Sequence, residues 1–369
     1  MGCTCLVNNI KEEFIKIKEI GNPGGICHSF LVKSKKTNEE CVYKKINISC
    51  SNSECKKYLN NIEILKKINH PNIIQYMVAD YSKGNQKFLN LITEFADGGD
   101  LQTKLNEQKK KKEYFVEDVL LNWFMQICLA LKFIHKKKIL HRDIKPSNIF
   151  LMKQESSNFA KLGYFNVAKE LTSGLNYAKT IVASPLYSAP EIINEKEYSY
   201  AADIWSLGVT FYQLITLDYP FEGKTEEEIK DNIRNVKKKE IPDDCKYDEK
   251  FIELINEMLS FREEERPSAK DILNRDIIKT RMECYLKENG FDLNSSLTII
   301  NKYNKELEEQ KKKNSFYSKS KIIIIDNEEF ILSKDGNDSN KNNEEKRAKK
   351  AIYDLNRQMT IIKDTIKES

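Results

Sequence analysis

The residues best suited to chemistry stand in one short run, His141-Arg142-Asp143-Ile144-Lys145-Pro146-Ser147-Asn148. Phosphoryl transfer requires a carboxylate that orients a hydroxyl group and accepts its proton, cations beside the phosphates, and a metal ion held in place. Asp143 can supply the carboxylate, Lys145 the cation, and Asn148 an amide oxygen for the metal. The run therefore predicts a phosphoryl-transfer site with Asp143, Lys145 and Asn148 as its catalytic residues.

Further motifs follow in a fixed order along the chain. They are Val42-Tyr43-Lys44, Thr93-Glu94-Phe95-Ala96, Asp97-Gly98-Gly99-Asp100-Leu101, Ala189-Pro190-Glu191, Asp203-Ile204-Trp205-Ser206-Leu207-Gly208 and Arg266. Together with the run at 141–148, they resemble the motifs of eukaryotic protein kinases. The resemblance covers about residues 14–286. It implies a two-lobed α+β kinase fold, ATP and magnesium as cofactors, and a protein substrate or partner.

Smaller features are similar to those of the NIMA-related serine/threonine kinases. His70-Pro71-Asn72-Ile73, followed by Gln75-Tyr76, resembles the segment after their αC helix, and residues 94–101 resemble their hinge. Residues 266–273 and 281–286 resemble the end of their kinase domain. These segments favour the NIMA-related group among the protein kinases.

The resemblance implies a nucleotide site in the first lobe. Gly21 would belong to the glycine-rich phosphate loop, and Lys44 would anchor the phosphates. The backbone groups of Glu94 and Ala96 would face adenine, while Asp100 would lie near the ribose. These five residues are the predicted contacts for ATP.

The resemblance also implies supporting roles outside the reaction itself. The residues with such structural roles are His141, Arg142, Phe165, Glu191, Asp203 and Arg266. Glu191 would pair with Arg266 in the helical lobe. Asp203 would brace the backbone of the catalytic loop.

Several positions depart from the kinase pattern. Tyr164-Phe165-Asn166 stands where kinases have Asp-Phe-Gly, and the lost aspartate is their principal magnesium ligand. A phenol is neutral near pH 7 and coordinates a hard cation weakly. Ten residues before Pro71, where the αC glutamate that pairs with Lys44 is expected, stands Asn61. The glycine-rich loop also carries an inserted proline, Pro23, which weakens phosphate binding by the loop backbone.

These departures leave two hypotheses for the function. In the first, the chain transfers phosphate weakly or not at all and acts as a signalling scaffold or allosteric module. In the second, it is an active ATP-dependent serine/threonine kinase that uses unorthodox metal coordination. The residues of that active site would be Lys44, Asp143, Lys145 and Asn148.

The elements that would position these residues divide the kinase-like region in two. Strand-like runs at 14–20, 29–33, 41–46 and 88–95, with a helix at 56–68, predict a β-rich N-lobe over about residues 14–96. Apolar patterns at 119–135 and 200–217 predict long helices, and a helix that is apolar all round is usually buried. A mainly helical C-lobe is therefore expected over about residues 97–286.

A polar C-terminal tail follows at 287–369, rich in Asn, Lys and Glu. Within it, residues 321–332 predict two strands around Asn327, and residues 333–345 predict disorder. Apolar residues then recur at spacings of 4, 3, 4, 3 and 4, which predicts a helix over 346–367. The stripe consists of Ala348, Ile352, Leu355, Met359, Ile362 and Ile366. Two alternatives stay open for it, a short coiled coil that dimerises the protein or recruits a partner, and a helix that packs on its own kinase domain.

The N-terminal segment, residues 1–13, begins Met1-Gly2-Cys3-Thr4-Cys5 and resembles dually acylated N-termini. Gly2 would carry myristate, and Cys3 and Cys5 would carry palmitate, because one acyl chain alone binds membranes only marginally. Leu6 departs from this pattern, which usually has Ser or Thr there. The alternatives are an unmodified N-terminus and an anchor at the cytosolic face of a membrane.

Composition excludes some classes of function. The net charge of +5 is small beside 61 Lys and Arg and 56 Asp and Glu, which argues against a nucleic-acid binder. The nine cysteines show no paired metal-ligand spacing. Reduced thiols in a cytoplasmic protein are therefore expected.

Overall fold

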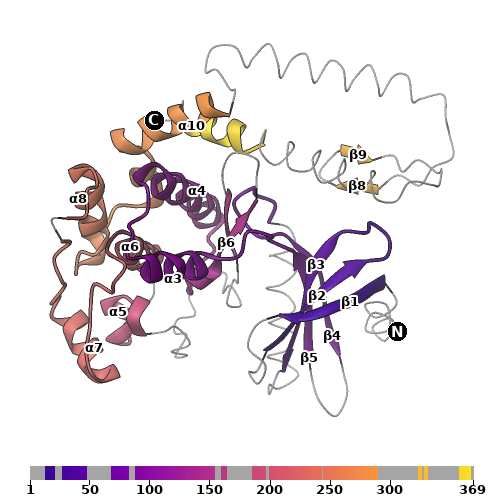
Figure 1. Cartoon of the computed structure of the whole chain (residues 1–369), viewed down its shortest axis with the longest axis horizontal. Coiled ribbons are helices and arrows are strands. Elements are labelled where there is room, and N and C mark those ends of the chain that lie inside the picture. The colour runs from indigo at the N-terminus through magenta and orange to yellow at the C-terminus, as the bar shows by residue number, and fades with distance from the viewer. Residues whose placement is uncertain are drawn as a thin grey trace. The chain divides into compact units, whose positions relative to one another are not determined.

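The first part of the chain folds into an antiparallel sheet with the strand order β1-β2-β3-β5-β4 (Figure 1). The strands are β1 (Phe14–Ile20), β2 (Cys27–Ser34), β3 (Glu40–Asn47), β4 (Tyr76–Ser82) and β5 (Phe88–Glu94). This computed structural model describes residues 13–20, 27–47, 68–82, 88–153, 159–163, 185–196, 199–242, 244–289, 323–325, 328–330 and 357–366.

Strand β3 lies between β2 and β5, which places Lys44 in the middle of the sheet. Lys44 is opposite Ser29 of β2 and Leu91 of β5. On this sheet Val32 and Ile92 are buried together with Cys41. β-branched side chains pack well on a pleated surface, and their burial here stabilises the strand that carries the lysine.

Two long apolar helices form the centre of the helical part. Helix α4 (Glu117–Lys136) is buried at every position from Leu120 to Leu131, and α6 (Tyr200–Thr216) is buried from Ala202 to Ile215. By length and composition α4 could also cross a membrane, but 72% of its apolar window is buried inside the protein. The apolar composition of α4 is therefore that of a core helix.

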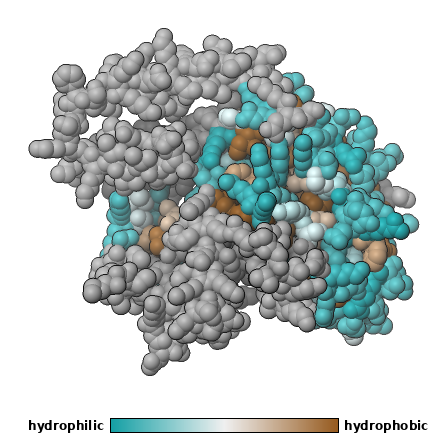
Figure 2. Space-filling view, turned by 180° about the vertical axis from the view of Figure 1, so that it is seen from behind, coloured by the Kyte–Doolittle hydropathy of each residue, from teal (hydrophilic) through white to brown (hydrophobic). Residues whose placement is uncertain are grey.

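Shorter elements surround these two helices. They are α3 (Leu101–Lys111), α5 (Pro190–Ile193), α7 (Glu226–Arg234), α8 (Glu249–Met258), α9 (Ala269–Leu273), α10 (Asp276–Glu288), the 3-10 turns η1 (Pro146–Asn148), η2 (Pro185–Tyr187) and η3 (Glu263–Glu265), and the hairpin of β6 (Ile149–Met152) and β7 (Phe159–Leu162). Seen from behind, the described surface of this part is mostly hydrophilic (Figure 2). This agrees with a charged share of 32% in the sequence.

The α+β architecture predicted from the sequence is confirmed, with a β-rich first part and a helical second part. The predicted strand at 14–20 is β1, and the predicted helices at 119–135 and 200–217 are α4 and α6. The helix predicted at 56–68 lies outside the described residues except for Ile68, which is not helical.

The chain forms two compact units, one of Met1–Met282 with Thr360–Ser369 and one of Glu283–Met359. In the second unit, β8 (Ile323–Ile325) pairs antiparallel with β9 (Glu328–Phe330), which confirms the two strands predicted around Asn327. A helix at 357–366, called the C-terminal helix below, confirms the last part of the helix predicted at 346–367. Residues 333–356 lie outside the described part.

Candidate active site

Asp143 lies in a small polar network within the run at 141–148. Its Oδ1 is 2.9 Å from Lys145 Nζ, and its Oδ2 accepts a hydrogen bond of 2.7 Å from Asn148 Nδ2. The same Nδ2 also donates to the backbone carbonyl of Asp143 at 2.6 Å. Both N–H bonds of the Asn148 amide are thus directed at Asp143, so its oxygen is the atom left to meet a cation. The structure brings the three predicted catalytic residues together.

The His141 ring connects this network to the end of β7. Its Nε2 is 2.9 Å from the carbonyl oxygen of Gly163, and its Nδ1 accepts the backbone N–H of Asp143 at 3.3 Å. Because a carbonyl oxygen can only accept, Nε2 carries the proton. Burial lowers the pKa of His141. The neutral ring therefore fixes the backbone on which Asp143 stands.

Asp203 of α6 accepts hydrogen bonds from the backbone of the same loop. Its two carboxylate oxygens accept the backbone N–H groups of His141 at 3.0 Å and Arg142 at 2.9 Å. Its Oδ2 is also 2.9 Å from His135 Nε2. Burial raises the pKa of Asp203, but the hydrogen bond with His135, the electrostatic interaction with the two rings and the hydrogen bond from the His141 backbone outweigh it, so the pKa lies below its ordinary value. The predicted brace between Asp203 and the loop backbone is present.

The backbone of Arg142 shows why the brace is needed. Its φ is +68°, in the left-handed region. This conformation costs about 1–2 kcal/mol for a residue with a Cβ atom. The hydrogen bond from its N–H to Asp203 holds the loop in this conformation.

The hinge segment after β5 is held against the β6 strand. Asp97 Oδ1 accepts the N–H of Lys153 at 2.8 Å, and the N–H of Gly98 donates to Leu151 O at 2.7 Å. A Cβ atom on Gly98 would lie 2.6 Å from that same oxygen, so the close approach requires glycine. Asp100, predicted near the ribose, uses its carboxylate to cap α3, where Oδ1 accepts the N–H of Thr103 at 2.8 Å.

Glu94 has a side-chain role that the sequence motifs did not indicate. Its Oε1 is 2.8 Å from Lys161 Nζ, and both side chains are almost fully buried, at 5% and 4% exposed. The same Oε1 accepts the backbone N–H of Gln75 at 2.8 Å. The end of β5 is therefore joined to β7, the strand that leads to Tyr164. The only sequence signal was a lysine inside an otherwise apolar strand, Phe159–Leu162.

Backbone contacts join the same regions. The carbonyl of Leu162 in β7 accepts the N–H of Ile74 at 2.9 Å, and the N–H of Leu162 donates to Asn72 O at 2.8 Å. Asn72 Nδ2 also donates to Ala160 O at 2.9 Å. The His70-Pro71-Asn72-Ile73 motif is thus the segment that attaches to β7.

The other predicted site residues divide into described and undescribed ones. The Lys44 side chain is buried in the sheet, at 6% exposed, and Ala96 follows β5 at 9% exposed. Several predicted residues lie outside the described part of the chain: Gly21 of the nucleotide site, Phe165 with its structural role, the two departures Asn61 and Tyr164, and Gly2, Cys3 and Cys5 of the acylation site.

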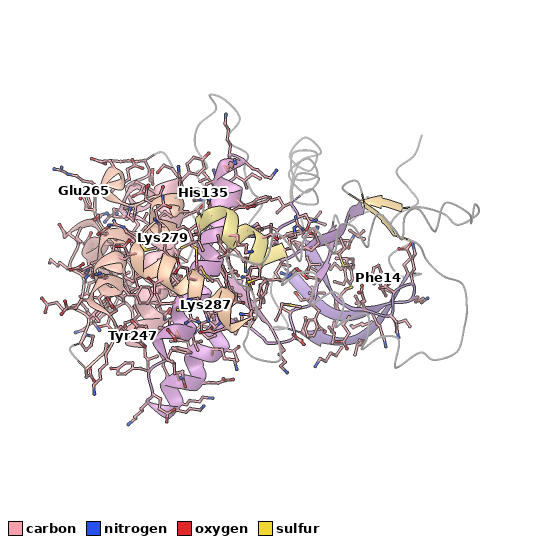
Figure 3. All side chains as sticks on the ribbon, turned by 90° about the horizontal axis from the view of Figure 1, so that it is seen from above. Phe14, His135, Tyr247, Glu265, Lys279 and Lys287 are labelled. Atoms are coloured by element: carbon pink, nitrogen blue, oxygen red, sulfur yellow. The ribbon has the colours of Figure 1, made fainter. Side chains whose placement is uncertain are left out.

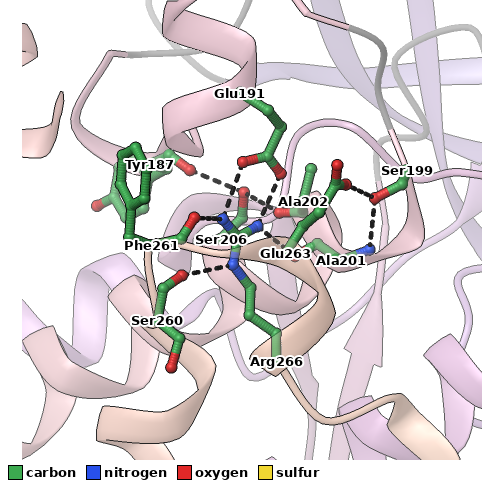
Figure 4. A network of polar contacts seen from close by, with 10 residues as sticks. All are labelled: Tyr187, Glu191, Ser199, Ala201, Ala202, Ser206, Ser260, Phe261, Glu263 and Arg266. Carbon is green, nitrogen blue, oxygen red and sulfur yellow. Dashed lines mark hydrogen bonds and ion pairs between the residues drawn. The ribbon is translucent and has the colours of Figure 1, made fainter.

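Glu191 and Arg266 form the predicted pair (Figure 4). Nη1 and Nη2 of Arg266 donate to the two carboxylate oxygens at 2.7 and 2.8 Å. The guanidinium also donates to three backbone carbonyls and lies 4.9 Å from the Trp205 ring centroid. The two residues join α5 to the segment before α9, and they lie apart from the catalytic run.

The described residues fit a nucleotide better than a metal ion. A buried lysine on β3 and a hinge held by backbone contacts suit ATP. The oxygen atoms around Asp143 that could coordinate a metal ion are the amide oxygen of Asn148 and the Asp143 carboxylate. This carboxylate is already in contact with Lys145 and Asn148. Across the described ranges, no three His, Cys, Asp or Glu residues gather to hold a metal ion. This donor set does not by itself fit a magnesium site.

Residues 14–278 match the protein-family model described as Protein kinase domain. The chain is 36% identical over 281 residues to the serine/threonine-protein kinase Nek1 of Mus musculus, covering 74% of this chain and 22% of that protein. It is 35% identical over 278 residues to Nek5 of Homo sapiens, covering 74% and 38%. It is 32% identical over 253 residues to Nek2 of Homo sapiens, covering 67% and 56%. The chain thus spans less than two thirds of the length of these relatives.

Proposed function

The chain belongs to the protein kinase family, and we propose that it is a Nek-like serine/threonine kinase relative that transfers phosphate weakly or not at all and acts as a signalling scaffold or allosteric module. The observation that carries this proposal is Tyr164, which stands in the sequence where kinases have the magnesium-binding aspartate. A phenol stays neutral near pH 7, whereas magnesium is held by carboxylates and phosphates. Asn61, in place of the glutamate that pairs with Lys44, supports the same conclusion.

The size of the expected defect follows from the electrostatics of phosphoryl transfer. Removing one preorganised group that stabilises a transition state lowers the rate about 100- to 1000-fold. Kinases turn over at about 1–100 per second. Two such groups are changed here, and their effects need not add. The loss of either one would reduce turnover to about 0.001–1 per second.

A second candidate function is an active serine/threonine kinase with unorthodox metal coordination. The geometry around Asp143 favours it, since Asn148 and Lys145 contact the carboxylate at 2.7 and 2.9 Å. A loop without a catalytic role has no need of this arrangement. In this alternative, Asn148 would be the metal ligand and ATP the phosphate donor.

Phosphotransfer by the purified full chain tests the proposal. We expect incorporation of phosphate from ATP into a general protein substrate, with magnesium or manganese, to equal that of the matched Asp143→Asn variant. The variant Tyr164→Asp restores a carboxylate at the metal position, and we expect it to raise incorporation at least about tenfold. This is less than the about 100-fold effect of one such group on the rate, because the other changed group stays changed. Robust incorporation by the unchanged chain that disappears in Asp143→Asn would overturn the proposal and establish the second candidate.

The cofactors and partners follow from the same proposal. ATP would bind weakly through Lys44 and the hinge backbone at Glu94 and Ala96, with little dependence on magnesium. A protein would be the partner, or the substrate if transfer survives. Acylation at Gly2, Cys3 and Cys5 would hold the protein at the cytosolic face of a membrane.

A further inference from the structure

The C-terminal helix, residues 357–366, has one buried face and one exposed face. Ile362 is fully buried and Thr365 is 5% exposed, whereas Thr360 and Asp364 are exposed. The two exposed residues lie one helical turn apart, and the buried residues occupy the other side. Such a face is buried only when another surface covers it.

The covering surface includes helix α4. Nζ of Lys132, near the end of α4, donates a hydrogen bond of 3.4 Å to the hydroxyl of Thr365. The C-terminal helix lies alongside α4 when the molecule is viewed from above (Figure 3). Residues Thr360–Ser369 belong to the same compact unit as Met1–Met282. The chain thus returns to its kinase unit after the polar tail.

The same side of α4 is already covered nearer its start. Arg281 of α10 donates to Asn122 Oδ1 at 2.7 Å. By the 3.6-residue period, Asn122 and Lys132 lie about 80° apart around the α4 axis. Leu129, between them in the sequence, is 1% exposed. One face of α4 therefore meets α10 at its first half and the C-terminal helix at its second half.

We propose that this second half, the α4 docking face around Lys132, is a helix-binding site whose occupant is residues 360–366 of the same chain. An amphipathic helix laid against an apolar surface with a few polar anchors is a common recognition mode. The side chain of Ile362, a member of the apolar heptad stripe, is then buried within one chain and is not available to a coiled coil. This proposal does not depend on whether the protein transfers phosphate.

Two matched variants of the full chain test the docking. Ile362→Asn places an amide on the buried face, and Asp364→Asn places the same side chain on the exposed face of the same helix. We expect Ile362→Asn to lower the melting temperature by several degrees, roughly 3–6 °C, and Asp364→Asn to leave it within about 1 °C. Amide hydrogen exchange should quicken in residues 357–366 and in the second half of α4 only for Ile362→Asn.

Light scattering distinguishes docking within one chain from docking between copies. We expect the unchanged protein to be a monomer at micromolar concentration. A dimer that becomes a monomer in Ile362→Asn would overturn the proposal, because the helix would then join two copies. Equal melting temperatures and exchange rates for the two variants would also overturn it. If Ile362→Asn does not fold, the milder Ile362→Ala gives the same comparison with a smaller shift.

Discussion

At the scale of single residues, Arg266 has no spare hydrogen-bond donor. Its five N–H bonds reach both carboxylate oxygens of Glu191 and the carbonyl oxygens of Ser260, Ala201 and Phe261. Arg266→Lys keeps the charge but removes the planar fork and two of the five donors, so Glu191 and the three carbonyl oxygens can no longer all be satisfied. We expect the free energy of unfolding to fall by about 3 kcal/mol, measured by chemical denaturation.

The matched control for this change is Arg262→Lys in the same segment. The Arg262 side chain is 70% exposed, and it forms an ion pair of 3.6 Å with Glu265. Surface pairs of this kind contribute about 0–1 kcal/mol. A loss in Arg266→Lys no larger than in Arg262→Lys would contradict the structural role of the buried pair.

His141 predicts a dependence of stability on pH. Its pKa lies below the ordinary 6.5 because the ring is buried. Between the folded and unfolded pKa values the unfolded chain binds more protons, so stability rises with pH and is lost as the pH falls below about 6.5. The loss is at most about 1.4 kcal/mol per pH unit for this one group. Asp203, whose pKa is lowered from 3.8, loses its contribution only at lower pH.

Melting temperatures at pH 7 and pH 5 check this expectation. His141→Gln removes the titrating ring, so we expect the difference between the two melting temperatures to shrink. His28→Gln is the control, because the His28 side chain is 46% exposed. The same pH difference in all three proteins would show that His141 does not carry the effect.

At this scale the sequence predicted the residues that belong to fixed motifs. The network of Asp143 and Asn148 and the pair of Glu191 and Arg266 could be expected because each residue stands at a fixed motif position. The pair of Glu94 and Lys161 could not, since its members are 67 positions apart and only the fold brings them together. Asp100 was assigned to the ribose, yet an aspartate just before a helix also caps it, as here.

At the scale of secondary-structure elements, the Glu94–Lys161 pair ties the hinge end of β5 to β7. Lys161→Met would remove the buried ammonium that lies 2.8 Å from the Glu94 carboxylate and leave that charge without its buried cation. Breaking a buried pair in this way costs about 3–5 kcal/mol, so we expect a loss of that size in chemical denaturation. Lys153→Met is the control, since Lys153 is exposed just after β6.

A double-mutant cycle separates the pair from general damage. Glu94→Gln removes the buried charge, so the double variant Glu94→Gln with Lys161→Met should be less destabilised than the sum of the single variants. Strict additivity would mean that the two side chains do not interact in solution.

Long elements were predicted from the sequence better than short ones. The helices α4 and α6 were expected because their apolar residues extend over several turns, and the β1 strand because it is rich in β-branched and aromatic residues. The hairpin of β6 and β7 was not predicted, since strands of four residues carry too little periodicity. The C-terminal helix was expected, but whether it packed within the chain or between chains depends on a surface that its own sequence does not encode.

At the scale of the whole molecule, the proposed acylation of the N-terminus would place the protein at a membrane. If Gly2 is myristoylated, Gly2→Ala removes one acyl chain, and stable anchoring takes two such signals. We expect the variant to move from the membrane to the supernatant fraction in cells. Equal partitioning of Gly2→Ala and the unchanged protein would rule out myristate as the anchor.

The return of the chain to its first unit at Thr360 has a consequence for how the tail can vary. The connection leaves that unit after Met282 and comes back to it, so it is a closure between two anchored ends. The entropy cost of such a closure grows only with the logarithm of its length, and doubling the length costs about 0.6 kcal/mol. Insertions between α10 and residue 357 should therefore be tolerated thermodynamically. Substitutions in the few turns that dock on α4 should instead destabilise the protein.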